Sequence, residues 1–299
     1  MKKFDVIIIG GSYAGLSAAM ALGRSLKRTL IIDAGKPCNR QTPHSHNFLT
    51  RDGETPQAIS AIALDQVMKY KSVSFKKGTV VSGSRTNNGF EINTGNNEVF
   101  IGKKLILATG IKDEIPDIPG FDESWGISVI HCPYCHGYEF KTKKTGILAN
   151  GDQAFHLAGL VYNLTNELTI LTNGNHDFTD DQIAKLGQHN ISVVESKLHE
   201  IVHSHGKIKS IIFEGGNSLN LDVMYAHVPF THHTDLSTTL GCTYTDQGYI
   251  EIDAFQKTMV PDIFACGDNS SRMRSVANAV STGNLAGAMA NMELTNESF

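Results

Sequence analysis

Cys132 and Cys135 lie three positions apart in the segment CPYC, near the middle of the chain. Two thiols at this spacing at the start of a helix can close a small disulfide ring, and the helix N-terminus favours the thiolate, which is the reactive form of cysteine. The neighbouring His131 and His136 would favour the thiolate further when they are protonated. The segment therefore indicates a redox-active dithiol.

Two other interpretations of this segment stay open. In the first, His131, Cys132, Cys135 and His136 supply ligands to a zinc ion. Adjacent His-Cys and Cys-His pairs cannot easily all face one tetrahedral ion, however, and the chain has no second C-x-x-C motif. In the second, the two cysteines are an inert pair in a protein core.

A glycine-rich turn, GGSYAG, follows the first apolar run of the chain. Its glycines would let the backbone approach a pyrophosphate, to which the next helix would offer its N-terminal amides. A carboxylate a little over ~20 residues further on stands where the ribose hydroxyls of an adenosine bind. A glycine-tightened turn without a ligand is the alternative. The candidate dinucleotide-binding residues are Gly10, Ser12 in place of the middle glycine of G-x-G-x-x-G, Tyr13, Ala14, Gly15, Asp33 and Ala34.

The elements around these motifs are predicted to form parallel sheets. An apolar, β-branched run, a helical pattern and a second apolar run give a βαβ unit at the start of the chain, and the same order recurs in the middle. Pro116 and Pro119 mark a boundary between the two. The fold class is α/β, with two Rossmann-like three-layer domains. The predicted strands are 4–10, 29–33, 104–110, 145–150 and 168–172, a helix covers 153–164, a strand leads into a loop within 261–268, and 275–294 has helix-packing spacing.

Composition sets limits on the class of protein. The chain has 299 residues, 40% hydrophobic and 19% charged, as expected of an ordinary globular protein of two domains. A net charge of −4 without basic clusters indicates neither nucleic acid nor a membrane as partner. Five cysteines with a single close pair argue against a secreted disulfide framework and for a reducing cytoplasm. The other three, Cys38, Cys242 and Cys266, are expected to be small buried residues.

Two short phrases resemble further signatures of FAD proteins: ATG at residues 108–110 and FACGD at 264–268. Together with the turn and the dithiol, they resemble the low-molecular-weight thioredoxin reductase family across essentially the whole chain. The resemblance implies a homodimer in which residues 1–112 and 228–299 form a discontinuous FAD domain, and 113–227 form a central domain that carries the C-x-x-C. The further FAD-binding candidates are Arg40, His46, Asn47, Ala108, Thr109, Gly110, Gly267, Asp268, Val276 and Ala277.

The resemblance also implies roles at the dithiol. Cys135 would be the thiol nearest the flavin C4a, and Cys132 the one that exchanges with the substrate. An acid usually follows the second cysteine in the family, whereas this chain has His136, which makes it the candidate general base at a reference pKa suited to neutral pH. The phrase CPYCHGYE looks most like the dithiol oxidases that close disulfides in natural products of the gliotoxin and holomycin type. The segment around Arg40, and HNFLTRDG from His46, also look like theirs.

The middle domain departs from the family pattern. Where an NADPH-binding reductase has a glycine-rich turn, residues 149–154 read ANGDQA, and where arginines would clamp the 2′-phosphate, residues 172–176 read TNGNH. Neither NADP nor NAD finds its usual partner, so use of NAD(P)H is doubtful. The alternative is that other residues compensate.

These observations predict an FAD-dependent dithiol/disulfide oxidoreductase. Its substrate would be a small dithiol or disulfide or a thioredoxin-like protein, with oxygen or ferredoxin as second redox partner. An NAD(P)H-dependent thioredoxin or small-disulfide reductase is the first rival. The second is a non-enzymatic redox sensor, in which the dithiol only reports the redox state.

Overall fold

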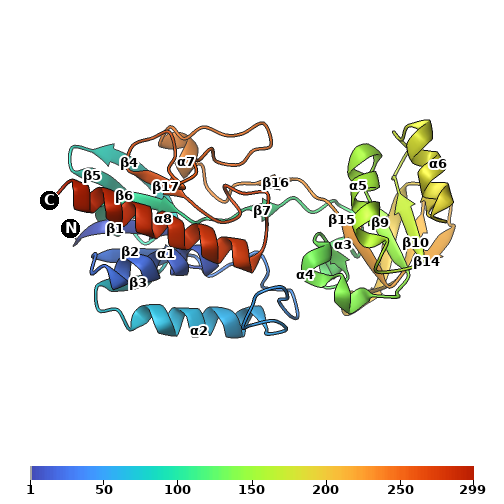
Figure 1. Ribbon diagram of the computed structural model, residues 1–299, viewed down its shortest axis with the longest axis horizontal. Coiled ribbons are helices and arrows are strands. Elements are labelled where there is room, and N and C mark those ends of the chain that lie inside the picture. Colours follow the sequence, from blue (N-terminus) through green and yellow to red (C-terminus); the bar gives the residue numbers. More distant parts are fainter. Residues whose placement is uncertain (1) are drawn as a thin grey trace. The chain divides into compact units, whose positions relative to one another are not determined.

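The computed structural model describes residues 2–299, which form two compact units (Figure 1). The first unit combines the N-terminal part of the chain with its C-terminal part, and the second is mainly the central segment. The first contains residues up to Arg40, Phe48–Lys112 and Phe230–Phe299, and the second contains Gln41–Asn47 and Asp113–Pro229. Among the described residues, no helix is both long and apolar enough to cross a membrane.

The first unit is built on a seven-stranded sheet. Its elements are β1 (Lys2–Ile9), α1 (Tyr13–Arg24), β2 (Thr29–Asp33), α2 (Pro56–Met68), β3 (Val73–Lys77), β4 (Val80–Thr86), β5 (Gly89–Thr94), β6 (Val99–Leu107), α7 (Leu236–Thr239), β17 (Ile263–Ala265) and α8 (Val276–Asn296). The strand order is β3-β2-β1-β6-β5-β4, with β17 also paired to β6. β1, β2, β3, β6 and β17 run parallel, whereas β4 and β5 are antiparallel additions. The predicted βαβ unit at the start of the chain is confirmed.

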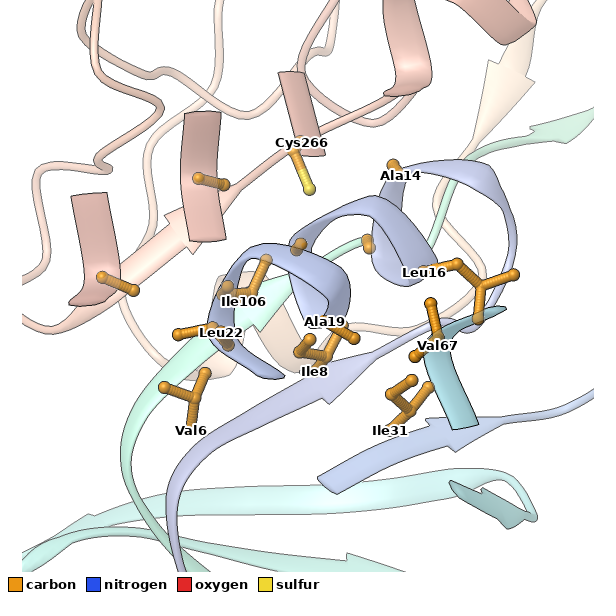
Figure 2. Packing of buried hydrophobic residues seen from close by; sticks show 14 of the residues in the cluster. Val6, Ile8, Ala14, Leu16, Ala19, Leu22, Ile31, Val67, Ile106 and Cys266 are labelled. Atoms are coloured by element: carbon orange, nitrogen blue, oxygen red, sulfur yellow. The ribbon is translucent and has the colours of Figure 1, made fainter. Parts of the chain in front are cut away.

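The core of this unit lies between the sheet and helix α1. Figure 2 shows Leu16, Ala19 and Leu22 of α1 against Ile8 of β1 and Ile31 of β2. All five side chains are at most 2% exposed. Full burial of a leucine or isoleucine side chain stabilises the folded state by about 1.5–3 kcal/mol. The continuous apolar runs that predicted parallel strands are therefore buried in the structure.

Helix α8 lies beside α1 at close range (Figure 1). A Cβ on Gly283 or Gly287 would come within 2.1 Å of the Ala14 carbonyl oxygen or 2.5 Å of the Ala18 carbonyl oxygen. Only glycine allows this approach of the two backbones. The N-terminal and C-terminal segments of the chain therefore share one core.

A buried lysine also ties the chain ends of the first unit together. Lys104 of β6 is 1% exposed, and its Nζ lies 2.7 Å from Asp262, 2.9 Å from Glu293 and 2.6 Å from Glu297. Burial alone would lower the pKa of Lys104, but hydrogen bonds to the three carboxylates raise it above its ordinary value. Lys104 is therefore charged, and it links β6 to the segment before β17 and to α8.

The second unit contains a five-stranded parallel sheet and a separate three-stranded antiparallel sheet. Its elements are α3 (Phe121–Ser124), β8 (Val129–Ile130), α4 (Pro133–His136), the 3-10 helix η1 (Tyr138–Phe140), β9 (Thr145–Leu148), α5 (Gly151–Val161), β10 (Leu168–Leu171), α6 (Asp180–Gln188), β11 (Ser192–Val194), β12 (Leu198–Ser204), β13 (Lys207–Phe213), β14 (Ser218–Asn220) and β15 (Val223–Ala226). The parallel order is β11-β10-β9-β15-β8, and β12-β13-β14 form the other sheet. The second predicted βαβ unit is β9-α5-β10.

The segment Gln41–Asn47 belongs to the second unit, whereas the boundaries drawn from the sequence place it in the first. The physical reason is a set of contacts within the second unit. Gln41 packs against Gly126, and His46 Nδ1 lies 3.5 Å from Glu139 Oε1. The chain passes between the units through β7 (Lys112–Asp113) and β16 (Phe230–Thr231), which pair with each other.

Candidate active site

The sheet of the first unit brings the predicted dinucleotide motifs to one edge. Ile9, at the end of β1, pairs with Ile32 of β2 and with Leu107 of β6, and Leu107 pairs with Ala265 of β17. The four strands run parallel, so the turns that follow them leave the sheet at the same edge. That edge is where open α/β sheets bind ligands.

The turn after β1 has the shape of a phosphate cradle. Gly10 has a φ of +104°, and a Cβ there would lie 2.1 Å from the carbonyl oxygen of Ala108. Ser12 is the N-cap of α1 without a side-chain hydrogen bond to the helix, and no acid stands in the first turn. The first amides of α1, from Tyr13 through Ala14 and Gly15, are thus available to an anion.

Asp33 is held in a fixed orientation beside this turn. Its Oδ1 accepts a hydrogen bond from the Gly11 amide at 2.9 Å, and its Oδ2 accepts one from the Gly35 amide at 2.9 Å. Ala34, the next residue, is exposed. A carboxylate placed at the end of β2 and oriented by two amides suits the hydroxyls of an adenosine ribose.

Two buried oxygens of the first unit lack a protein partner in the described part of the chain, one in the loop after β17 and one in the segment after β2. Asn269 is fully buried and donates to the Leu107 carbonyl at 2.9 Å and to Thr109 Oγ1 at 3.2 Å. Its Oδ1, like Oδ1 of Asn39, has no hydrogen-bond partner among the described residues. Buried polar atoms are normally paired, so these two oxygens fit a ligand with donor groups. FAD carries such hydroxyls and ring N–H groups.

Asp268 lies in this same loop. Its Oδ2 is 3.7 Å from Cys38 Sγ and 4.0 Å from Arg274 Nε. The amide of Gly267 donates to Thr282 Oγ1 of α8 at 3.1 Å, which fixes the loop against the start of that helix. Val276 and Ala277 form the first turn of α8, and Ala277 is exposed.

The remaining candidate FAD-binding residues differ in their exposure and in the unit to which they belong. Arg40 is exposed and donates to the Pro37 carbonyl at 3.2 Å. Ala108 is 8% exposed, and Gly110 faces open space. Asn47 has a positive φ of 58° and lies with His46 in the segment that packs with the second unit.

The dithiol begins directly after β8 of the second unit. Cys132 is the N-cap of α4, and its Sγ accepts a hydrogen bond from the Cys135 amide at 3.2 Å. Pro133 fills the first helical position, where its fixed φ starts the turn and no amide is needed. Both cysteines are partly buried. An N–H donor to sulfur favours the thiolate, so Cys132 is prepared for exchange.

A glycine and a buried tyrosine lie beneath this turn. A Cβ on Gly137 would come within 2.4 Å of the Pro133 carbonyl oxygen, 2.6 Å of Leu164 Cδ1 and 2.9 Å of the Tyr225 hydroxyl. Tyr225 of β15 is 1% exposed, and burial, followed by the charges of Cys132 and Glu139, raises its pKa above the ordinary value. The tyrosine is therefore neutral below the dithiol.

The pKa of His136 in the folded protein is lower than its reference value. Burial, with a smaller contribution from the neighbouring charge of His46, lowers the pKa of His136 to about 4. The imidazole is therefore neutral at pH 7, so it can accept a proton but cannot hold it. The two rings lie 6.4 Å apart between centroids, at right angles.

The zinc interpretation finds no matching geometry. Among the described residues, no three of His131, Cys132, Cys135 and His136 bring ligand atoms within 4.8 Å of one another. Within residues 2–299, the one group of side chains that meets this distance is Asp262, Glu293 and Glu297. The ammonium of Lys104 already lies among these carboxylates. The arrangement at the cysteines therefore favours thiol chemistry.

The turn after β9, where a second dinucleotide would bind, is filled by a side chain of the protein itself. Asn150 Oδ1 accepts hydrogen bonds from the Gly151 amide at 2.8 Å and from the Asp177 amide at 3.0 Å, and its Nδ2 donates to the Asn175 carbonyl at 2.9 Å. The side chain thus links the start of α5 to the loop after β10. The first amide of α5 is occupied by protein rather than open to a phosphate.

The surroundings of this turn are acidic. Asp152 stands in the first turn of α5 and accepts from Gln182 at 2.7 Å. Glu195 accepts from the His176 amide at 2.9 Å, in the loop where an NADP-binding protein places its arginines. Carboxylates here would repel the 2′-phosphate and the pyrophosphate of NADPH.

Three features of the candidate site were not predicted from the sequence. Asn269 follows Asp268 directly, so its place after a buried strand was a usable signal. Tyr225 lies within an apolar run and gives no signal. The contact of Glu139 with His46 joins residues far apart in the chain, and neither residue indicates the other by type or spacing.

Comparison with known proteins agrees with this geometry. The family profile described as "Pyridine nucleotide-disulphide oxidoreductase" matches residues 4–283. "Thioredoxin reductase tcpT" of Claviceps purpurea (strain 20.1) is 33% identical over 301 residues, which cover 97% of this chain and 94% of that protein.

Two solved structures extend the similarity to three dimensions. The oxidoreductase from Agrobacterium tumefaciens is 37% identical with a TM-score of 0.92, and 99% of each chain is covered. The putative thioredoxin reductase TrxB from Bacillus anthracis is 33% identical with a TM-score of 0.93, and the match covers 99% of this chain and 100% of that one. The chain therefore belongs to the pyridine nucleotide-disulphide oxidoreductase family, as a thioredoxin reductase-like, FAD-dependent enzyme that acts on disulfides.

Proposed function

We propose that this enzyme is a dithiol oxidase that draws electrons from a small dithiol through Cys132 and Cys135, and that it does not use NADPH as its reductant. The observation that carries the proposal is the closed turn after β9. Asn150 accepts a hydrogen bond from the Gly151 amide at the start of α5 and binds the loop after β10 through two more, to Asp177 and Asn175. A pyrophosphate would have to break this arrangement and then face Asp152 and Glu195.

The thiol chemistry follows from the two cysteines. A substrate thiolate attacks the Cys132 sulfur of the oxidised pair, so a mixed disulfide forms and Cys135 leaves as a thiolate. The second substrate thiol attacks the substrate sulfur of that mixed disulfide, which closes the substrate disulfide and frees Cys132. Neutral His136 accepts the proton of the attacking thiol. Bound FAD would supply the two-electron acceptor that returns the pair to its oxidised state, with oxygen or ferredoxin as the final acceptor.

We assign the cofactor to the first unit. The predicted residues after β1, β2, β6 and β17 stand at one edge of its sheet, and the unpartnered oxygens of Asn39 and Asn269 support a ligand there. We also propose that the active form is a homodimer and that it acts in the cytoplasm. Five cysteines with a single close pair in a chain of 299 residues are consistent with a reducing compartment.

An NAD(P)H-dependent reductase of thioredoxin or another small disulfide is the second candidate. It is favoured by the names of the relatives, since both the Claviceps purpurea and the Bacillus anthracis proteins are called thioredoxin reductases. The two functions use the same cysteines and differ in which partner supplies the electrons.

Anaerobic stopped-flow mixing of the purified flavoprotein with NADPH, NADH and dithiothreitol separates the two candidates. For the oxidase, dithiothreitol bleaches the flavin absorbance at about 450 nm, and neither nicotinamide does so at a comparable rate. The Cys135→Ser variant should lose bleaching by dithiothreitol altogether. Rapid bleaching by NADPH would overturn the proposal in favour of the reductase, and unchanged bleaching of the variant would remove the dithiol from the mechanism.

A further inference from the structure

Three imidazoles and one carboxylate form a row beside the dithiol, all within the second unit. The ring centroids of His136 and His46 lie 6.4 Å apart, and those of His46 and His44 also lie 6.4 Å apart. His46 Nδ1 lies 3.5 Å from Glu139 Oε1. His136 and His46 are both partly buried, with the His46 side chain 19% exposed, whereas His44 is exposed.

We propose that His46 and Glu139 act as a proton-accepting pair, which takes the substrate proton from His136 and passes it to solvent by way of His44. The inference rests on the proposed dithiol chemistry and adds relay residues that do not touch the substrate. It also gives the segment Gln41–Asn47 a reason to pack with the dithiol-bearing unit.

The reaction requires such an exit for a proton. When a dithiol exchanges with the Cys132–Cys135 disulfide, two S–H bonds of the substrate break, one S–S bond forms in the substrate, and the protein S–S bond breaks. Both electrons of the oxidation stay on the two protein sulfurs. One proton returns to Cys132, and the other must leave because Cys135 remains a thiolate. Each exchange step therefore releases one proton near His136.

His136 cannot retain this proton, because its burial disfavours the charged imidazolium. His46 differs in its contacts, because Glu139 Oε1 lies 3.5 Å from its Nδ1 and can orient the ring. Among the titratable groups beside the row are Cys132 and Cys135 of the dithiol turn and Tyr225 of β15, whose pKa is raised mainly by burial and then by the charges of Cys132 and Glu139. His44 and Glu139 at the outer end of the row are exposed, so the proton leaves toward solvent there.

The test uses the flavin-loaded protein and two signals in one anaerobic stopped-flow experiment. Dithiothreitol is the probe, flavin absorbance reports electron transfer, and a pH indicator in weak buffer reports proton release. The variants are His46→Gln and Glu139→Gln, which keep size and hydrogen bonding but remove the base. His156→Gln is the matched control, an exposed histidine on α5 of the same unit.

We expect both relay variants to release the proton about tenfold more slowly than the wild type at pH 7, since positioned acid–base groups contribute at least that much. Added imidazole should restore the rate in His46→Gln, which a purely structural role would not allow. His156→Gln should behave as the wild type. Proton release at the wild-type rate in both variants, or a loss that imidazole does not rescue, would overturn the relay. A wild-type flavin that dithiothreitol fails to bleach counts against the proposed function instead, and the indicator still reports the relay during thiol exchange.

Discussion

The neutral state of His136 links the stability of the protein to pH. The unfolded chain binds a proton at this imidazole near pH 6.5, whereas the folded protein does so only near pH 4. Between these values the unfolded state holds more protons, so the free energy of unfolding falls as the pH drops through this window. The stabilisation is fully present above pH 6.5 and is lost toward pH 4.

We therefore predict that His136→Asn flattens part of this dependence. Between pH 7 and pH 5 the wild type should lose about 2 kcal/mol more unfolding free energy than the variant does. Urea titrations of both proteins at the two pH values measure the difference. His156→Asn serves as the control and should follow the wild type. Parallel curves for His136→Asn and wild type would show that the imidazole titrates normally in the folded protein.

At the scale of residues, the motifs with local geometry were readable from the sequence. The spacing of Cys132 and Cys135 predicted a dithiol, and the distance of Asp33 from the glycine turn predicted a carboxylate that binds a ribose. The properties that depend on burial were not readable. Nothing in the sequence around His136 states that its imidazole is desolvated, and nothing near His46 names Glu139 as its partner.

At the scale of elements, α4 depends on a glycine that follows it. In Gly137→Ala the new methyl group would press on the Pro133 carbonyl oxygen, on Leu164 and on the Tyr225 hydroxyl. Overpacking of this kind typically costs about 1–3 kcal/mol. We expect a lower unfolding free energy and a changed rate of Cys132 alkylation by iodoacetamide, since the turn that carries Cys132 has to move.

The control for this variant is Gly159→Ala, within helix α5, where a Cβ meets no atom within 4 Å. Alanine is the better helix former, so this protein should gain about 0.5–1 kcal/mol. Chemical denaturation and alkylation kinetics compare the two variants. Equal stability of Gly137→Ala and wild type would mean that the turn relaxes without cost.

Elements were predictable where they are apolar and long. The buried strands of both βαβ units were expected from continuous β-branched runs, and the structure places β1, β2, β9 and β10 there. The antiparallel sheet β12-β13-β14 was not foreseen, because short strands with one polar face resemble loops in composition. The segment Gln41–Asn47 groups with the second unit, which the sequence did not indicate, since its partners lie far away in the chain.

At the scale of the whole molecule, the cluster around Lys104 should carry part of the stability of the first unit. Lys104→Met leaves Asp262, Glu293 and Glu297 without their shared cation. Removing one partner of a buried pair costs about 3–5 kcal/mol, and the partly exposed carboxylates reduce this to about 2 kcal/mol. Scanning calorimetry should show the loss in one of two transitions, if the units melt separately.

Lys103→Met is the matched control for that experiment. Its side chain is 58% exposed and reaches Asp5 only at 3.9 Å, so the substitution should change the free energy of unfolding by no more than about 0.5 kcal/mol. A similar small change for Lys104→Met would show that the carboxylates are satisfied by water.

The shared core of α1 and α8 has a consequence for biosynthesis. During translation the glycine turn and β2 are synthesised early, whereas α8, the helix that packs on α1, is synthesised after all the other elements of the fold. At about 5–20 residues per second, the nascent N-terminal sheet waits roughly 10–40 s for its missing layer. During that wait the central segment, contiguous apart from Gln41–Asn47, has all its strands outside the exit tunnel. During synthesis the second unit can therefore fold and position its dithiol before the first unit is complete enough to bind FAD.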